Sequence, residues 1–469
     1  MAEDIRNELN DEMLSIDSRG TRILSEGRLF RAFSAKENHD FVRPIFESGL
    51  VDELNSRGMI PRTWISDRKI DGYDAVVEHE LISPVTLPFE WSFLMLQDAA
   101  LAFLELVELS ARYGYYLKDA HPYNFVWKDG SPLWVDFGSF ERADTEFGDF
   151  FALRLFVKFF YEPLVMWSRF GDFFGAVMME NRSEEARLGT DSFWRLTHPV
   201  TRLIPWHLLV RIARMEESFQ RLAGIRDVEA RGKRGMVLAG GRLLKKIFYR
   251  DTSALCRKWL RKIRRIPAPQ NRGQWSDYHR SLGDVEHYPR FCRILEIIDS
   301  LKCRSTLELA GNSGAFSLML ARHGVGGRII CSDNDARAVD QLYRTVRGGR
   351  VPQVTPAWLD IRYPIVANGF DGPQKRFRSE AVLALAVTHH LILSQKIKLP
   401  QLLNMIGSYA TKFVLIEFMP LGLYDGTCAT PIPEWYTVDW FRSEFLKKFS
   451  LLQECVLEEN RILFVGKLP

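Results

Sequence analysis

The sequence predicts two architectures in one chain: an α+β domain with two lobes, followed by an α/β domain with a mostly parallel sheet and helices on both faces. Through the second half, apolar runs of strand length alternate with segments of helical periodicity, as in doubly wound sheets. The first half instead has short strands around one helix, followed by a long helical stretch. The chain of 469 residues is also too long for one ordinary domain.

The first half reads as a small lobe over residues 1–85 and a helical lobe over 86–250. Its expected strands and helices follow from runs of two-residue and of three- to four-residue apolar spacing. We expect strands at 27–34 and 73–82, a helix at 39–58, a long helix at 89–113 and mostly helical structure over 147–246.

A basic connector is expected over residues 251–275. Arg and Lys are concentrated in 242–265. The Pro-Ala-Pro of 267–269 forms a stiff extended spacer, which indicates a domain boundary. The basic run could contact anionic lipid or nucleic acid, but a solvated helix face is the commoner meaning of such a run. Because the net charge is only +4, there is no strong signal for nucleic-acid binding.

The second half, residues 276–469, is expected to form the α/β domain. Its predicted strands and helices alternate: strands at 305–309, 328–332, 382–387 and 412–418, and helices at 316–323, 336–347 and 399–411. Ligands of such sheets bind beyond the carboxyl ends of the strands, where Glu308, Asp333, His389 and Glu417 are expected to lie.

Composition narrows the class of protein. Hydrophobic residues make up 46% and charged residues 26%, as in an ordinary globular protein. The six cysteines form no Cys-x-x-Cys pair, so we expect no metal site and no disulfide framework, and reduced thiols favour a cytoplasmic protein. The apolar region 147–179 is interrupted by charges, so we expect buried helices there and no transmembrane segment.

One motif in the first half carries a definite chemistry. Asp119 is followed by Asn124 five residues later and by Asp136, in Asp-Phe-Gly, twelve residues after that. In kinases at this spacing the first Asp orients an acceptor hydroxyl, while the Asn and second Asp hold magnesium on the phosphates. Asp119-Ala-His-Pro-Tyr-Asn124 is similar to the aminoglycoside phosphotransferase group.

The other sequence motifs of a kinase are poorly matched or absent. No Gly-x-Gly-x-x-Gly loop is present, Arg31 stands where the phosphate-binding lysine is expected, with Glu47 as its helix partner, and Leu117 replaces the catalytic-loop histidine. We therefore favour a kinase-like fold with weakened or lost phosphotransfer. Binding of Mg-ATP by an active phosphotransferase, with the second half regulatory, is the alternative.

The segment 306–317, Thr-Leu-Glu-Leu-Ala-Gly-Asn-Ser-Gly-Ala-Phe-Ser, predicts a nucleoside site. A strand ends in an acid, a turn of small residues follows, and a helix begins at Ala315. Small residues allow a ligand to approach the backbone, and Asp333 at the end of the next strand offers a carboxylate to ribose hydroxyls.

This turn resembles motif I of the class I methyltransferases. The acid lies ahead of the glycines, and Ala310 and Asn312 stand at positions where glycine would be common. The position of the acid favours S-adenosylmethionine over NAD as the ligand. The resemblance implies cofactor binding by the backbone of the turn, by Asp333 at the ribose and by Asp360 at the adenine. The full implied set is Glu308, Ala310, Gly311, Asn312, Gly314, Asp333 and Asp360. Alternatively, Glu308 and Asp333 only cap turns at strand ends.

Candidates for the chemistry lie further along. His389 and His390 end the fourth apolar strand, where a neutral imidazole with a pKa near working pH could take a proton from the acceptor. A histidine that only packs or caps a helix is the competing interpretation. Glu417, near the end of the next strand, is a second candidate for binding or activating the acceptor.

Together the halves resemble a bacterial group of class I methyltransferases that carry a kinase-like region in front. The resembling segments are 89–93, 117–120, 385–391 and 416–420. Within that group the chain is similar to rhizobial host-specific nodulation proteins, which implies methylation of an unspecified, small-molecule acceptor in nodulation. Glu380 departs from the Asp that the group more often has before the fourth strand. The sequence leaves open the acceptor atom, the oligomeric state and a purely scaffolding role.

Overall fold

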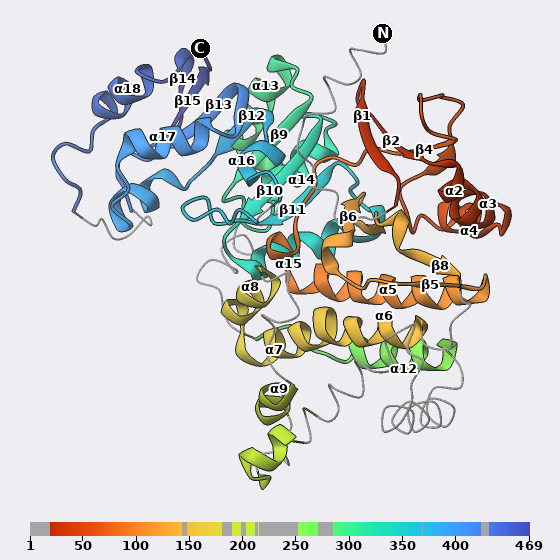
Figure 1. Ribbon diagram of the computed structural model, residues 1–469. Coiled ribbons are helices and arrows are strands. Elements are labelled where there is room, and N and C mark those ends of the chain that lie inside the picture. Colours follow the sequence, from red (N-terminus) through yellow and green to blue (C-terminus); the bar gives the residue numbers. More distant parts are fainter. Residues whose placement is uncertain are drawn as a thin grey trace, which may run out of the picture.

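The computed structural model describes residues 19–142, 148–180, 190–197, 203–211, 214, 252–270, 285–367, 369–423 and 431–469. Figure 1 shows a small sheet near the N-terminus, a layer of long helices, and a larger sheet carrying the C-terminus. The small sheet is antiparallel in the order β1-β2-β4-β3. Its strands are β1 (Thr21–Ser25), β2 (Arg28–Phe33), β3 (Thr63–Ile65) and β4 (Ala75–His79).

The helix expected over 39–58 is divided into four short elements. Gly49 has a φ of +78°, which ends one helical segment and begins the next. The elements are α2 (Ala35–Glu37), η1 (Asn38–Val42), α3 (Arg43–Glu47) and α4 (Leu50–Ser56). The predicted long helix is α5 (Phe93–Arg112), preceded by the 3₁₀ turn η2 (Pro88–Glu90).

Two short antiparallel pairs follow α5. They are β5 (Tyr115–Leu117) with β8 (Phe140–Arg142), and β6 (Phe125–Lys128) with β7 (Ser131–Trp134). The single turns η3 (Pro122–Asn124) and η4 (Phe137–Ser139) lie between them. Helices then continue as α6 (Gly148–Phe156), η5 (Val157–Tyr161), α7 (Glu162–Phe170), α8 (Asp172–Glu180) and α9 (Thr190–Thr197). The part of the helical prediction that covers 215–246 lies outside the described residues.

The basic connector contains the helix α12 (Thr252–Arg264), which packs along α5 (Figure 1). Cys256, Leu260 and Ile263 are buried, whereas its basic side chains face outward, and Arg257 pairs with Glu108 of α5 at 3.6 Å. This geometry agrees with the expected solvated helix face; residues 242–251 of the basic run lie outside the described part.

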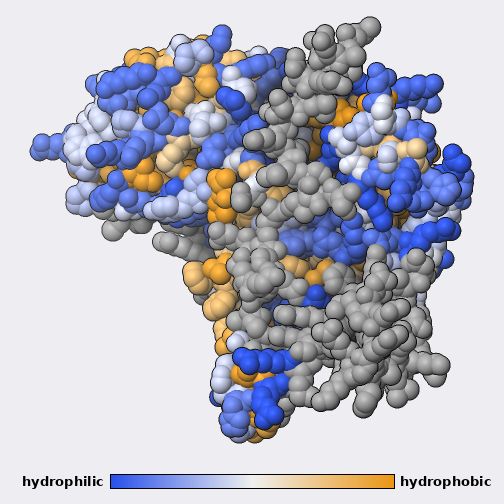
Figure 2. All heavy atoms as spheres, in the orientation of Figure 1, coloured by the Kyte–Doolittle hydropathy of each residue, from blue (hydrophilic) through white to orange (hydrophobic). Residues whose placement is uncertain are grey.

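Within the described residues no helix is long and apolar enough to cross a bilayer. The surface in Figure 2 is largely hydrophilic, with scattered apolar patches. Phe173, which is 75% exposed, lies on α8 with the partly exposed Phe174 and Val177.

The second half forms a seven-stranded mixed sheet in the order β11-β10-β9-β12-β13-β15-β14. Its first five members are parallel, and the C-terminal hairpin is antiparallel to β13, a part that the sequence analysis did not anticipate. The strands are β9 (Ser305–Leu309), β10 (Arg328–Asp333), β11 (Val354–Trp358), β12 (Ser379–Ala384), β13 (Ala410–Phe418), β14 (Ser450–Glu458) and β15 (Arg461–Lys467).

Helices cover both faces of this sheet, as predicted for a doubly wound fold. One face buries Leu309, Val382 and Ile416 in a cluster with side chains of α17 (Leu399–Gly407) and α18 (Val438–Leu446). The other face buries Cys331, Leu383 and Leu415 with α13 (Pro289–Leu301), α14 (Ala315–Arg322) and α15 (Ala336–Val346).

The two halves share one apolar core, which runs from Phe33 to Val465. At their contact, Trp127 meets Tyr343 edge to face with ring centroids 5.3 Å apart. Arg376 of α16 (Pro373–Arg376) forms a buried ion pair with Glu90 and also donates to the carbonyl of Val85 at 2.7 Å. The predicted domain boundaries therefore divide the sequence without dividing the core.

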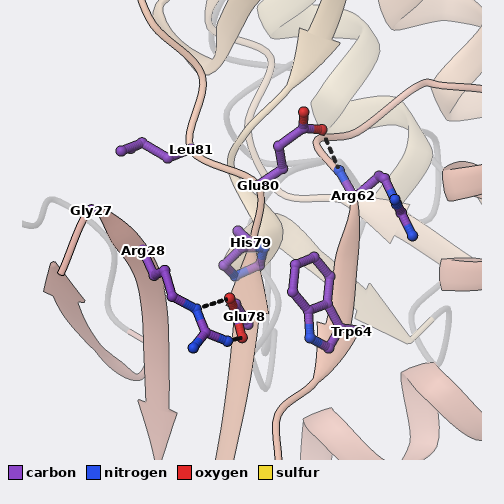
Figure 3. Close-up of a pocket in the computed structure, with 8 residues that line it drawn as sticks. All are labelled: Gly27, Arg28, Arg62, Trp64, Glu78, His79, Glu80 and Leu81. Carbon is purple, nitrogen blue, oxygen red and sulfur yellow. Dashed lines mark hydrogen bonds and ion pairs between the residues drawn. The ribbon is translucent and has the colours of Figure 1, made fainter. Parts of the chain in front are cut away.

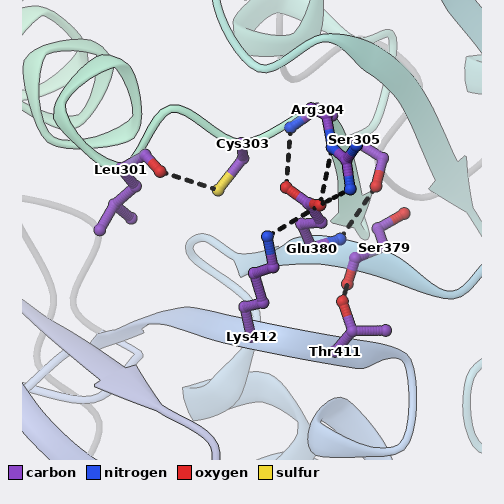
Figure 4. A network of polar contacts seen from close by, with 8 residues as sticks. All are labelled: Leu301, Cys303, Arg304, Ser305, Ser379, Glu380, Thr411 and Lys412. Carbon is purple, nitrogen blue, oxygen red and sulfur yellow. Dashed lines mark hydrogen bonds and ion pairs between the residues drawn. The ribbon is translucent and has the colours of Figure 1, made fainter.

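Glu380 lies at the start of β12, and Figure 4 shows Arg304 and Lys412 pointing toward its carboxylate. Its carboxylate accepts from the Arg304 backbone N–H at 2.9 Å, from the Arg304 guanidinium at 3.1 Å and from Lys412 Nζ at 2.9 Å. These hydrogen bonds, the backbone one first, lower the pKa of Glu380 to about 2.

We expect Glu380→Gln to lower the free energy of unfolding by about 1 kcal/mol at pH 7, because partly exposed charged partners contribute modestly. Since the folded pKa lies below the unfolded value, this contribution is complete above pH ~4.5 and is lost as the pH falls toward 2. Urea unfolding at pH 7 and pH 3 tests it. Glu53→Gln, at an exposed pair with Arg57, is the control and should change stability by less than ~0.5 kcal/mol at both values. A pH-independent loss would contradict the prediction.

Candidate functional site

The turn after β9 presents its backbone in a conformation that glycine usually supplies. Ala310, Asn312 and Gly314 have φ values of +55°, +51° and +74°. Two of these residues carry side chains in the left-handed region, which is costly and is concentrated at functional sites. At Gly311 a Cβ would lie 2.6 Å from Cys331 Sγ and 2.9 Å from Glu308 Cδ, so only glycine fits there.

Glu308 lies beneath this turn. Its carboxylate accepts from the Ser317 backbone N–H at 3.1 Å and from the Ser317 hydroxyl, which ties β9 to α14. Full burial raises the pKa of Glu308 to about 7. Glu308 thus ties the turn to α14, and its part in cofactor binding stays a prediction.

Asp333 lies at the end of β10 beside the turn. Its carboxylate accepts from the backbone N–H of Asn312 at 2.7 Å and of Asp335 at 2.8 Å. The side chain is almost buried, and burial raises its pKa to about 6. The predicted neighbours Asn312 and Asp333 are thus brought together by a direct hydrogen bond.

Asp360 follows β11, the strand next to β10. Its Oδ1 accepts from the backbone N–H and the Nε of Arg362 at 2.9 and 2.7 Å, and its Oδ2 pairs with the same guanidinium. The Asp360 side chain remains 28% exposed. Arg362 therefore orients a carboxylate that is still open to a ligand.

His389 and His390 follow β12, with their ring centroids 4.0 Å apart. His389 is buried, and its Nδ1 makes no hydrogen bond within the described part of the chain. Burial, followed by the charges of His390 and Arg461, lowers the pKa of His389 to about 3, and burial lowers that of His390. The expectation of a pKa near working pH for this imidazole is therefore corrected: His389 is neutral and weakly basic in this environment.

Glu417 is held by its neighbours. One carboxylate oxygen accepts from Arg461 Nη1 and from the Ala386 backbone N–H, both at 2.7 Å. Ala386 has a φ of +51°, which turns the chain after β12 toward this carboxylate. Glu417, paired with Arg461, thus contacts the loop that carries His389. That Glu417 binds or activates an acceptor stays a prediction.

Sequence reasoning missed four residues that hold the predicted ones in place. Asp335 caps α15 by accepting from the N–H groups of Arg337 and Ala338, and an Asp just before a helical run is a signal that could have identified it. Arg362 is a local partner, two residues after Asp360. Ser317 and Arg461 carry no such signal, because they meet Glu308 and Glu417 only once the chain has folded.

Hydrogen bonds through Asn124 also join the three residues of the kinase-like motif. Asn124 Nδ2 donates to Asp119 Oδ2 at 3.1 Å and to Asp136 Oδ2 at 3.3 Å, and burial raises the pKa of Asp119. Arg31 lies on β2, where its charge adds to burial in lowering the pKa of His79. Whether this region has a kinase-like fold and function stays a prediction.

A pocket of about 200 Å³ lies on the small sheet (Figure 3). Figure 3 shows Arg28 and Trp64 on either side of Glu78. The Arg28 guanidinium is already engaged, with Nε 2.7 Å from Glu78 Oε1. The pocket contains none of the predicted site residues. Across the described residues, no group of three or more His, Cys, Asp or Glu side chains is arranged to hold a metal ion.

Comparison with known proteins finds a distant relative. The chain is 24% identical over 352 residues to the nodulation protein NoeA of Rhizobium meliloti (strain 1021), covering 74% of this chain and 71% of NoeA. No family model matches the sequence.

Solved structures match less than half of the chain at low scores. A SAM-dependent methyltransferase from Aquifex aeolicus has a TM-score of 0.32 at 13% identity, covering 41% of this chain and 98% of that one. Magnesium protoporphyrin IX methyltransferase from Synechocystis PCC 6803 with bound SAM has a TM-score of 0.29 at 13% identity, covering 43% and 86%. The doubly wound fold is established by the strand order and helix placement described above, independently of these scores.

Substitutions in the left-handed turn are expected to differ in their effect on the free energy of unfolding. We expect Gly314→Ala to lower the free energy of unfolding by about 2–3 kcal/mol, because backbone strain adds to a Cβ contact 2.6 Å from Leu342 Cδ1. Ala310→Gly should stay within about 0.5 kcal/mol of wild type, since relief of strain offsets the flexibility of glycine. Urea unfolding measures both.

Gly58→Ala is the matched control. Gly58 has a φ of +58°, but no atom lies within 4 Å of the place that a Cβ would take, so it isolates the backbone cost of about 1 kcal/mol. Equal losses at Gly58 and Gly314 would show that close packing against α15 does not constrain the turn.

Proposed function

We propose that the chain is an S-adenosylmethionine-dependent methyltransferase that acts on a small-molecule acceptor. The observation that carries this proposal is the left-handed turn 310–314 beside the Asp333 carboxylate. Both lie where β10 and β12 flank β9 on opposite sides, and doubly wound sheets bind ligands at such a switch point. The similarity to SAM-dependent methyltransferases in the sequence motifs supports the same ligand.

The residues present fit such a donor. A carboxylate offers about four acceptor positions, and the backbone N–H groups of Asn312, Asp335 and Asn334 approach Asp333, which leaves capacity for a ribose hydroxyl. Asp360 is partly exposed and oriented by Arg362, as adenine recognition would require. The turn 310–314, with Gly311 at its close approach to Glu308, would bind the methionine end.

The donor would supply a methyl group on a sulfonium, a strong electrophile. A bond forms from the acceptor atom to the methyl carbon as the carbon–sulfur bond breaks, and the acceptor releases a proton. His389 is neutral, and its Nδ1 lacks a partner among the described residues, so it would orient the acceptor or accept its proton transiently through a hydrogen bond. The principal contribution of the chain is then positioning.

The relation to NoeA supports a role in nodulation. We infer that the acceptor belongs to the chemistry of nodulation signals, and a labelled-methyl transfer assay on extracts of the native cell tests this. Transfer of label by wild type and its absence with Asp333→Ala would support an enzyme. Donor binding without any labelled product would favour a scaffolding role instead.

A second function, phosphotransfer, is favoured by one observation: Asn124 bridges Asp119 and Asp136, the arrangement that kinase chemistry uses. Arg31 in place of a lysine argues for lost activity. We therefore expect Mg-ATP to leave the melting temperature of the wild type unchanged, like that of Asp136→Ala. A rise of several degrees in wild type, abolished by Asp136→Ala, would instead support nucleotide binding.

We expect the dissociation constant of S-adenosylhomocysteine to rise as the pH falls below about 6, by up to tenfold per unit. The reason is that only ionised Asp333, whose pKa is about 6, accepts from a ribose hydroxyl. Asp333→Asn should weaken binding at pH 7.5 by about 10- to 100-fold and remove this dependence. Calorimetry between pH 5 and 8 measures it.

Glu308→Gln is the matched control, because Glu308 titrates nearby, with a pKa of about 7, yet faces Ser317. It should keep the pH dependence of binding. If Glu308→Gln abolishes that dependence and Asp333→Asn does not, the assignment of Asp333 to the ribose is wrong.

A further inference from the structure

The N-terminal half contacts the second half at α15, the helix that begins three residues after Asp333. Asp340 of α15 accepts from the backbone N–H of Leu94 at 3.0 Å and thereby caps the N-terminus of α5, whose own N-cap residue Ser92 makes no side-chain cap bond. Asp340 is itself nearly buried. A residue of the second half thus completes a helix of the first.

The C-terminal part of α15 contacts the same helix. Tyr343 Oη donates to Asp98 Oδ2 at 2.7 Å, and Arg347 Nη2 donates to Asp98 Oδ1 at 2.5 Å. Because Asp340, Tyr343 and Arg347 lie at spacings of three and four residues, all three project from one face of the helix region toward α5. α15 is therefore attached to α5 along most of its length.

A third contact reaches the strand beside Asp333. Trp358 is the register partner of Asp333, and its Nε1 donates to the carbonyl of Asn334 at 3.0 Å. The indole stacks on Trp167 of α7, with centroids 5.5 Å apart and an interplanar angle of 27°. Trp167 is fully buried and is held in turn by Asp172, 2.8 Å from its Nε1.

We propose that the N-terminal half is a positioning scaffold for the nucleoside end of the donor site, acting through Asp340, Tyr343 and Trp358. This inference rests on the proposed methyltransferase function. The contacts hold α15 from Asp340 to its C-terminal end and hold Trp358 at the end of β11. α15 follows Asp333 in the chain, and β11 leads to Asp360. A carboxylate that must meet a ribose hydroxyl tolerates displacement of only about 0.5 Å. The scaffold supplies that rigidity from outside the sheet.

Calorimetric titration of the full chain with S-adenosylhomocysteine tests the proposal. Tyr343→Phe removes only the hydroxyl that reaches Asp98, and Asp340→Ala removes the cap on Leu94. Each should raise the dissociation constant at least fivefold. Asp340→Asn keeps an acceptor oxygen for the Leu94 N–H and should stay within twofold of wild type.

Two further measurements separate positioning from general loss of stability. Ser34→Ala removes the side-chain cap of α2, far along the chain from the donor site, and should leave the dissociation constant within twofold of wild type at a comparable loss of stability. With 5′-methylthioadenosine, which lacks the amino-acid end, Tyr343→Phe should show the same fold-loss as with S-adenosylhomocysteine.

The outcomes are distinct. If wild type binds neither compound, the proposed function fails and the scaffold proposal fails with it. If wild type binds but Tyr343→Phe and Asp340→Ala bind as tightly, or Ser34→Ala weakens binding as much as they do, the scaffold proposal alone is overturned. Should Asp340→Ala not fold, Tyr343→Phe decides the question.

Discussion

The candidate site depends on one constraint of the large sheet: β9 pairs with β10 on one side and with β12 on the other, all in parallel. Parallel neighbours end at the same edge, so turns from three different segments meet there. This pairing brings together the left-handed turn after β9, Asp333 at the end of β10 and the His389 loop after β12. Hydrogen bonds from neighbouring side chains then fix the positions of these residues.

Those supporting side chains share a physical property, which is exclusion of water. Glu308 and Asp333 both have pKa values raised by burial, and His389 has a pKa lowered by it. A hydrogen bond made in such surroundings is electrostatically stronger than one made in water, so few groups suffice to orient a ligand. The buried pair Glu417–Arg461 extends the same polar layer below the loop that follows β12.

The sequence predicted the parts of the site whose cause is local. The acid before the turn, the small residues within it and Asp333 at the next strand end all follow from short-range pattern, and their proximity follows from parallel pairing. Arg461 and Trp167 could not be predicted, because their partners lie far away in sequence. The hairpin β14–β15 was missed since β14 is an edge strand of mixed exposure, with Gln453 and Glu454 interrupting its apolar alternation. The basicity of His389 was misjudged because burial is a tertiary property.

The cap that Asp340 places on α5 has a consequence for the order in which the chain matures. Leu94 and Asp340 are separated by 246 residues, so ribosomal synthesis delivers the cap roughly 10–50 s after its helix. During that interval the N–H groups at the start of α5 have only water as partner, and Glu90 awaits Arg376. The first half therefore completes these contacts only after the second half has emerged from the ribosome.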